Sequence, residues 1–342
     1  MGLLRVTGTI EVKQFWPQGT SDADTAVILV GVDAQDAFKF QETPGGAFRT
    51  THAFEGAMVH GKQGPKAPID DKGRIRVRLQ GIDAPELHYQ PSPLGRKLKE
   101  SLSQSKIDAY KALTHKYRQP WAESSTFALL GLVSQVGRPV IDCEVTSIVA
   151  EPTDVFDTYG RLVGDIWIRI GGARKNINQW LVREGWVFPA FYDSMKANGI
   201  NTIRRAYASG KKKGRVAASL AAKVVTLDFN LVYRSGKGLD FTSGDDQGAV
   251  LFPKVYRRLV TWSAQKKAGI TTKTFKAHVA AGADKYHRLA DFLADEKNAT
   301  QYPLDTVLGS AGKCNLKPEA TVFIEEANSL LKKDNEVVRT WF

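Results

Sequence analysis

The stretch RIRVRLQGIDAPE, Arg74–Glu86, decides the fold of this chain and points to its chemistry. In its first half, arginines alternate with apolar residues, so a strand here turns three apolar side chains to one face and three arginines to the other. Its second half is a corner, because Pro85 fixes its own φ and favours an extended conformation in the residue before it. The stretch therefore places Arg78, Asp83 and Glu86 on one rigid support, and phosphodiester cleavage needs groups of these kinds.

The composition is that of a globular protein with an excess of positive charge. The chain has 342 residues, enough for two domains, with 42% hydrophobic and 25% charged residues. Its 48 Lys and Arg outnumber its 36 Asp and Glu, for a net charge of +12. This excess favours a polyanionic partner, with nucleic acid preferred over an acidic membrane surface. On charge alone, a basic protein without such a partner stays an alternative.

The ends and the cysteines of the chain indicate a reduced, cytoplasmic protein. Residues 1–6 contain no apolar core long enough for a signal peptide, and we find no run of about 18 apolar residues that could span a membrane. The two cysteines, Cys143 and Cys314, do not suggest a disulfide framework, and alternation places Cys143 on an apolar face in the core. The six histidines lack paired metal spacing, which disfavours zinc or a histidine-based triad.

Alternation and helical periodicity divide the first part of the chain into elements and two insertions. A region rich in Gly and Pro, residues 33–72, is interpreted as an insertion or a long flexible loop, and a second insertion covers residues 88–121. The expected strands cover 5–15, 25–32, 74–79, 139–149 and 161–170. One helix is expected to begin near Ala122, and two more are expected over 176–184 and 200–222.

After residue 222 the pattern changes. Residues 224–233 alternate like a strand, and Ser235–Gly238 is typical of a hairpin turn. Amphipathic helices follow, one of them predicted from apolar residues at helical spacing between Tyr286 and Leu293. We find no catalytic motif here, so residues 223–342 are predicted to form a mixed or mainly helical accessory domain.

Two further motifs carry charged groups next to predicted strands. Asp22-Ala23-Asp24-Thr25 places two carboxylates just before a strand, although such a pair taken alone is more often a turn. Asp157-Thr158-Tyr159-Gly160-Arg161 places an arginine between a tight turn and a strand, where an arginine taken alone is usually solvated. Each motif gains weight only in combination with the others.

Taken together and in this order, these motifs resemble the thermonuclease (staphylococcal nuclease-like) family. Leu181–Gly185 and the basic helix with Lys211-Lys212-Lys213 extend the resemblance, which covers residues 5 to about 222. It implies an OB-fold, a five-stranded β-barrel with helices (α+β), in a nuclease domain over 1–222. Thr158 stands where the staphylococcal enzyme has a lysine, which removes one positive charge.

The resemblance also implies an activity and a role for each matching residue. Family members hydrolyse DNA and RNA phosphodiesters with Ca²⁺ and little sequence specificity. In the metal site, Asp24 and Asp83 would supply carboxylates and Ala84 a backbone carbonyl. Among the remaining groups, Glu86 would orient or deprotonate water, Arg78 and Arg161 would grip the phosphate, and Tyr159 would lie along the nucleotide.

Elementary chemistry supports these roles. A phosphodiester is an anion that repels hydroxide, and its transition state gathers further charge, which a divalent cation and two guanidinium groups neutralise. Carboxylate and carbonyl oxygens suit Ca²⁺.

Two alternatives to a nuclease remain: a non-catalytic nucleic-acid-binding OB module, and a scaffold that acts through a protein partner of its C-terminal domain. The retained carboxylates argue against the first, because pure binding gains nothing from carboxylates that face phosphate.

Overall fold

A computed structural model of the chain describes residues 1–31, 34–234, 246–325 and 329–342. Contacts within the chain define two compact units, each assembled from separate segments. The barrel unit contains residues 1–82, 126–181 and 325–342, and the second unit contains residues 83–125 and 182–324. The division of the sequence into domains over 1–222 and 223–342 stays a prediction.

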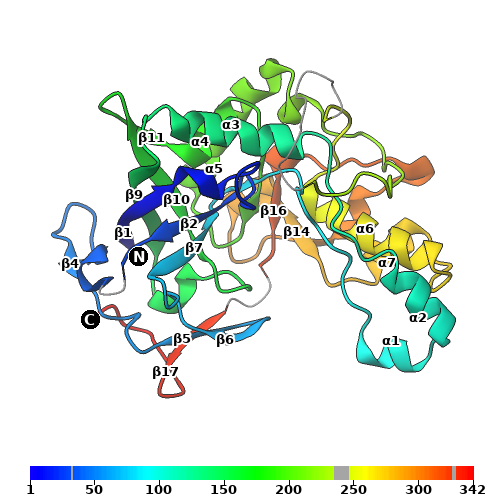
Figure 1. Cartoon of the computed structure of the whole chain (residues 1–342), viewed down its shortest axis with the longest axis horizontal. Coiled ribbons are helices and arrows are strands. Elements are labelled where there is room, and N and C mark those ends of the chain that lie inside the picture. Colours follow the sequence, from blue (N-terminus) through cyan, green and yellow to red (C-terminus); the bar gives the residue numbers. More distant parts are fainter. Residues whose placement is uncertain (32–33, 235–245, 326–328) are drawn as a thin grey trace. The chain divides into compact units, whose positions relative to one another are not determined.

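The barrel unit is built around a closed barrel of five strands (Figure 1). The strands are β1 (Gly2–Glu11), β2 (Thr25–Leu29), β7 (Arg74–Leu79), β9 (Val140–Val149) and β10 (Leu162–Ile170). Their order around the barrel is β1, β2, β7, β10 and β9, which pairs again with β1. Only the β7–β10 pair of this ring is parallel. The predicted five-stranded barrel is confirmed.

Alternation in the sequence explains why these strands form a barrel with one filled face. In β9, Ile141, Cys143 and Val145 are buried, which confirms the core position predicted for Cys143. In β10, Gly164 lies very close to β9. A Cβ atom added to Gly164 would come 2.8 Å from the backbone oxygen of Thr146. A glycine is therefore required for the two strands to pack at this point.

Helix α4 (Ile177–Arg183) is joined to the barrel through the fully buried side chain of Asn178. Its Nδ2 donates to the backbone oxygens of Gln80 (3.0 Å) and Gly164 (3.1 Å), and its Oδ1 accepts from the N–H of Ile166 (3.2 Å). One amide thus satisfies backbone groups at the end of β7 and in β10. Strand β11 (Ala173–Asn176) precedes α4, and helix α3 (Ala122–Ser134) precedes β9.

The first insertion contains short strands, so the second interpretation of residues 33–72, a long flexible loop, was wrong. The strands are β3 (Phe38–Gln41), β4 (Arg49–Thr50), β5 (Met58–Gly61) and β6 (Gly64–Lys66). Their partners explain the failure, because β3 pairs with barrel strand β1 and β5 pairs with a strand from the far end of the chain.

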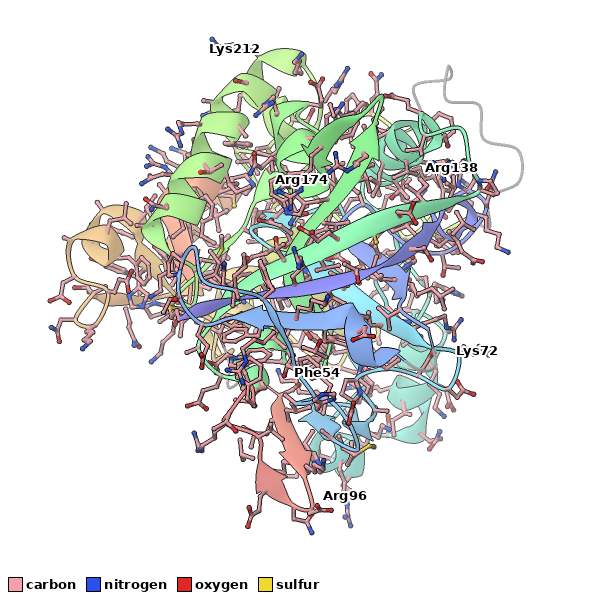
Figure 2. The ribbon with its side chains drawn as sticks, turned by 90° about the vertical axis from the view of Figure 1, so that its left-hand side faces the viewer. Phe54, Lys72, Arg96, Arg138, Arg174 and Lys212 are labelled. Carbon is pink, nitrogen blue, oxygen red and sulfur yellow. The ribbon has the colours of Figure 1, made fainter. Side chains whose placement is uncertain are left out.

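Residues 329–342 belong to the barrel unit and cover this insertion. Strand β17 (Leu330–Lys333) pairs with β5 and with β18 (Glu336–Val337). Trp341 stacks on Phe40, with 4.1 Å between ring centroids. Phe54, labelled in Figure 2, packs against Trp341 with 6.0 Å between centroids. The last described residues therefore complete an apolar cluster of the barrel unit.

The second unit combines helices with a four-stranded sheet. The helices are α1 (Arg96–Glu100), α2 (Gln104–Lys111), α5 (Ala197–Gly210), α6 (Pro253–Lys267), α7 (Phe275–Ala280) and α8 (Leu289–Ala294). The sheet contains β13 (Phe191–Tyr192), β16 (Thr321–Phe323), β14 (Lys285–Arg288) and β15 (Gln301–Pro303), in that order. The mixed character predicted for the region after residue 222 is confirmed.

The second insertion shares a core with α6, and Figure 1 shows α2 beside α6. Leu94 and Tyr110 pack there with Ala264 and Ala268. In the described residues, no helix has both the length and the apolar character needed to cross a membrane.

Two local predictions in the second unit were wrong. Residues 224–233 form no strand, and only isolated bridges occur nearby, at Lys223 and Val232. The helix predicted from Tyr286 begins at Leu289 instead, because Tyr286 lies in β14 opposite residues of β15 and β16. The turn predicted at Ser235–Gly238 lies outside the described residues.

Candidate active site

Strands β2 and β7 bring Asp24 and Arg78 together in the barrel unit. Thr25 lies opposite Arg78 in the strand register, so Asp24 falls at the end of the pair. The Arg78 guanidinium forms an ion pair with Oδ2 of Asp24 and donates to its backbone oxygen at 3.3 Å. These side chains are 11% and 9% exposed, so Arg78 is buried although its two neighbouring arginines in the strand are exposed. Thr25 Oγ1 donates to the other oxygen of Asp24 (3.2 Å).

The turn before β10 holds Arg161 in a fixed orientation. One oxygen of Asp157 accepts from the backbone N–H groups of Tyr159 and Arg161, both at 2.9 Å. Its other oxygen accepts from Nε and Nη2 of Arg161, both at 2.7 Å. The third nitrogen, Nη1, donates to Thr25 Oγ1 at 3.2 Å. Arg161 and the Asp24–Arg78 pair therefore meet at Thr25.

Tyr159 lies on the outside of this turn. The residue is 47% exposed, and the centroid of its ring lies 5.7 Å from Cζ of Arg161. An exposed aromatic ring next to an arginine offers a surface on which a nucleotide could lie.

The first insertion adds a lysine to this turn that sequence reasoning missed. Lys66, in β6, donates from Nζ to the backbone oxygen of Tyr159. Burial lowers the pKa of Lys66, and the positive charges of Arg76 and Arg161 lower it further, while Asp157 raises it. Lys66 thus lies among the charged groups of the turn in which Thr158 replaces the family's lysine. The sequence carried no signal for this, because 93 positions separate Lys66 from Tyr159.

In the second unit, one arginine of helix α6 holds two of the predicted site residues. The guanidinium of Arg257 contacts Oδ2 of Asp83 at 3.1 Å through Nη2 and Oε1 of Glu86 at 2.5 Å through Nη1. The side chains of Asp83 and Glu86 are only 1% and 15% exposed, and that of Arg257 is 29% exposed. Each of these contacts is a charge-assisted hydrogen bond, stronger than one between neutral groups.

The backbone beside Glu86 is also held. The Glu86 N–H donates to the side-chain oxygen of Gln119 (2.9 Å), and the Gln119 N–H donates to the Glu86 oxygen (2.8 Å). Ala84, two positions earlier, is buried. Sequence reasoning missed both Arg257 and Gln119, because neither forms part of a local motif.

The donor chemistry of the predicted ligands fits Ca²⁺. Asp24, Asp83 and the backbone of Ala84 offer only oxygen atoms, and both aspartates are buried. Within residues 1–31, 34–234, 246–325 and 329–342, no group of three or more His, Cys, Asp or Glu side chains is placed to hold a metal. An arginine contacts each of the two aspartates instead.

The comparison with known families agrees with this fold. Residues 76–216 match the family described as Staphylococcal nuclease homologue. The matched range contains Arg78, Asp83, Glu86 and Arg161, whereas Asp24 precedes it. No curated protein matches the chain. The family match and the closed five-stranded barrel together confirm the predicted resemblance: residues 76–216 match a staphylococcal nuclease-like domain.

Proposed function

We propose that this protein is a calcium-dependent nuclease that hydrolyses phosphodiester bonds of DNA or RNA with low sequence specificity. The observation that supports it most directly is that Thr25 joins Arg161 to the buried Asp24–Arg78 ion pair. A buried arginine on a barrel strand is costly to desolvate, so its retention calls for a function. The match of residues 76–216 to the family described as Staphylococcal nuclease homologue supports phosphate binding as that function.

In this proposal the two arginines bind the phosphate that is attacked. A guanidinium presents paired N–H donors that match the oxygens of a phosphate, and its charge is fixed at any physiological pH. Arg161 is already oriented by Asp157, so little rotational freedom is lost when it binds substrate. Tyr159 lies along the nucleotide, and Lys66 adds a positive charge beside it.

Asp24, Asp83 and the carbonyl of Ala84 would hold Ca²⁺. When bound, the ion would neutralise charge on the phosphate and increase its electrophilicity. Glu86 orients the attacking water and accepts its proton.

Arg257 is the positioning residue for Asp83 and Glu86 in the second unit. It contacts one oxygen of Asp83 and one of Glu86, which fixes the two carboxylates relative to each other. It also offsets the repulsion between two negative groups that are only three positions apart in the sequence.

The proposal is tested with the pure full-length protein. Single-stranded and double-stranded DNA and RNA are incubated with Ca²⁺, Mg²⁺ or EDTA, beside a Glu86→Gln variant of unchanged thermal stability. We expect degradation that requires Ca²⁺ and falls sharply in the variant. Equal degradation by both proteins would remove Glu86 from the mechanism. Tight binding without degradation under any condition would favour the non-catalytic OB module instead.

A further inference from the structure

The second unit contains a cavity of about 690 Å³ that the proposed reaction does not use. Three aromatic rings and three lysines are prominent in its lining: Phe229, Trp262, Phe275, Lys266, Lys267 and Lys276. No acidic side chain occurs among the described residues that line it. Its volume falls within the ~300–1,000 Å³ typical of sites for small organic ligands. The cavity therefore combines flat apolar surfaces with positive charge.

The aromatic rings are held in place by their neighbours. Trp262 on α6 and Phe275 on α7 have ring centroids 5.4 Å apart, and Figure 1 shows these helices side by side. The indole N–H of Trp262 donates to the backbone oxygen of Lys273 at 2.9 Å. Phe229 packs edge-on against Tyr117, with 5.7 Å between centroids. Rings that are already ordered lose little freedom when a planar ligand stacks on them.

The lysines are exposed and lie over these rings. Nζ of Lys266 is 4.8 Å from the Trp262 ring centroid, and Nζ of Lys267 is 4.2 Å from that of Phe229. Neither lysine forms an ion pair within the segments that the structure describes. Basic residues at the end of a helix are favoured by its dipole. The helix dipole does not account for the aromatic surface below them, which points to a ligand that is both planar and anionic.

We propose that this cavity is a second nucleic-acid site, which binds unpaired bases of a single strand. Bases would stack on Trp262 and Phe229, and the two lysines would move from the ring faces to the adjacent phosphates. A duplex cannot supply this contact, because its bases are stacked on one another. The site would bind substrate independently of the residues proposed for cleavage.

Binding of a labelled 12-nucleotide oligothymidine is measured by fluorescence anisotropy with the full chain in EDTA, so that calcium-dependent cleavage does not occur. We expect Trp262→Ala to weaken binding on the order of 5–100-fold, the range for loss of one stacking ring. Trp262→Phe keeps a ring and is expected to bind nearly as well as the wild type.

The lysines are tested by the salt dependence of binding. Lys266→Ala with Lys267→Ala should lower the slope of log affinity against log salt by about 1.4, since each phosphate contact to a single strand contributes about 0.7. The matched control is Lys97→Ala with Lys99→Ala, which removes the same charge from the exposed helix α1 of the same unit.

Three results would overturn the proposal. These are an unchanged affinity and slope in the Lys266/Lys267 variant, an equal loss in the Lys97/Lys99 control, or equally tight binding of a duplex with the same dependence on Trp262. If Trp262→Ala fails to fold, the lysine variant decides. Because the assay measures binding without calcium, its outcome is separate from that of the nuclease test.

Discussion

Replacing Arg257 by glutamine separates its proposed positioning role from a contribution to stability alone. The substitution removes two charge-assisted hydrogen bonds, to Asp83 and to Glu86. A hydrogen bond to a charged group contributes about 1.5–3 kcal/mol to the free energy of unfolding. Because the Arg257 side chain is 29% exposed, solvent screens part of this electrostatic contribution. We therefore expect the free energy of unfolding to fall by about 2 kcal/mol in total.

The neighbouring residue on α6 provides a matched control. Arg258 pairs with Asp284 through Nε and Nη2, both at 2.6 Å, and its side chain is 36% exposed. Arg258→Gln removes the same charge and a similar number of bonds but touches neither Asp83 nor Glu86 in the structure. We expect a similar loss of stability, about 2 kcal/mol, from this variant.

The two variants should differ in activity. Loss of a residue that orients metal ligands typically costs roughly 10–100-fold in activity, so we expect Arg257→Gln to lose this much in kcat with little change in KM. Arg258→Gln should retain the wild-type kcat. Arg257→Lys should recover only part of the loss, because a lysine restores the charge but not the forked geometry.

The assays are initial rates on single-stranded DNA with Ca²⁺, and urea unfolding followed by both fluorescence and circular dichroism. Equal activity of Arg257→Gln and Arg258→Gln at equal loss of stability would refute the positioning role. An inactive wild-type protein would refute the nuclease proposal itself.

Further substitutions test other parts of the barrel unit. Arg78→Ala or Arg161→Ala should lower the cleavage rate on the order of 10²–10³-fold, whereas Arg174→Ala, at a labelled position in Figure 2, should leave the rate unchanged. Asn178→Ala removes three hydrogen bonds to buried backbone groups and should lower the free energy of unfolding by about 3 kcal/mol in urea titrations. Burial raises the pKa of Asp165 from 3.8 to about 6, so its contribution to stability is present below pH 3.8 and lost as the pH rises through 6. Asp165→Asn should therefore raise the free energy of unfolding at pH 8 by up to about 3 kcal/mol, measured as a higher thermal midpoint, and should have no such effect at pH 3.5.

The barrel could be predicted from the sequence because each of its strands has one buried face. That burial imposes a period of two, which is readable in Arg74–Leu79 and again in Val140–Val149. The motif residues Asp24, Arg78 and Arg161 were also identifiable, because they lie at the ends of such strands. Their assigned roles remain predictions.

What the sequence could not predict depends on partners that lie far along the chain. The strands of residues 33–72 show little periodicity, because each is short and two of them, β3 and β5, pair with distant segments. The sequence around Tyr286 fits a helix as well as a strand. Tyr286 lies in a strand because β14 pairs with the neighbouring strands β15 and β16. Arg257 lies 171 positions from Glu86, so no local pattern could connect them.

The packing of the last described residues onto the first insertion has a consequence for synthesis. Thr51 donates to the backbone of Trp341 across 290 positions. A ribosome adds ~5–20 residues per second, so roughly 10–30 s separates the emergence of Ile170, at the end of the last barrel strand, from that of Leu330. During that interval Phe40 and one edge of β5 lack their partners, and such an edge is prone to intermolecular pairing. The nascent chain is thus most vulnerable to aggregation while its second unit is being made, and a chaperone that covers residues 38–61 would act in that window.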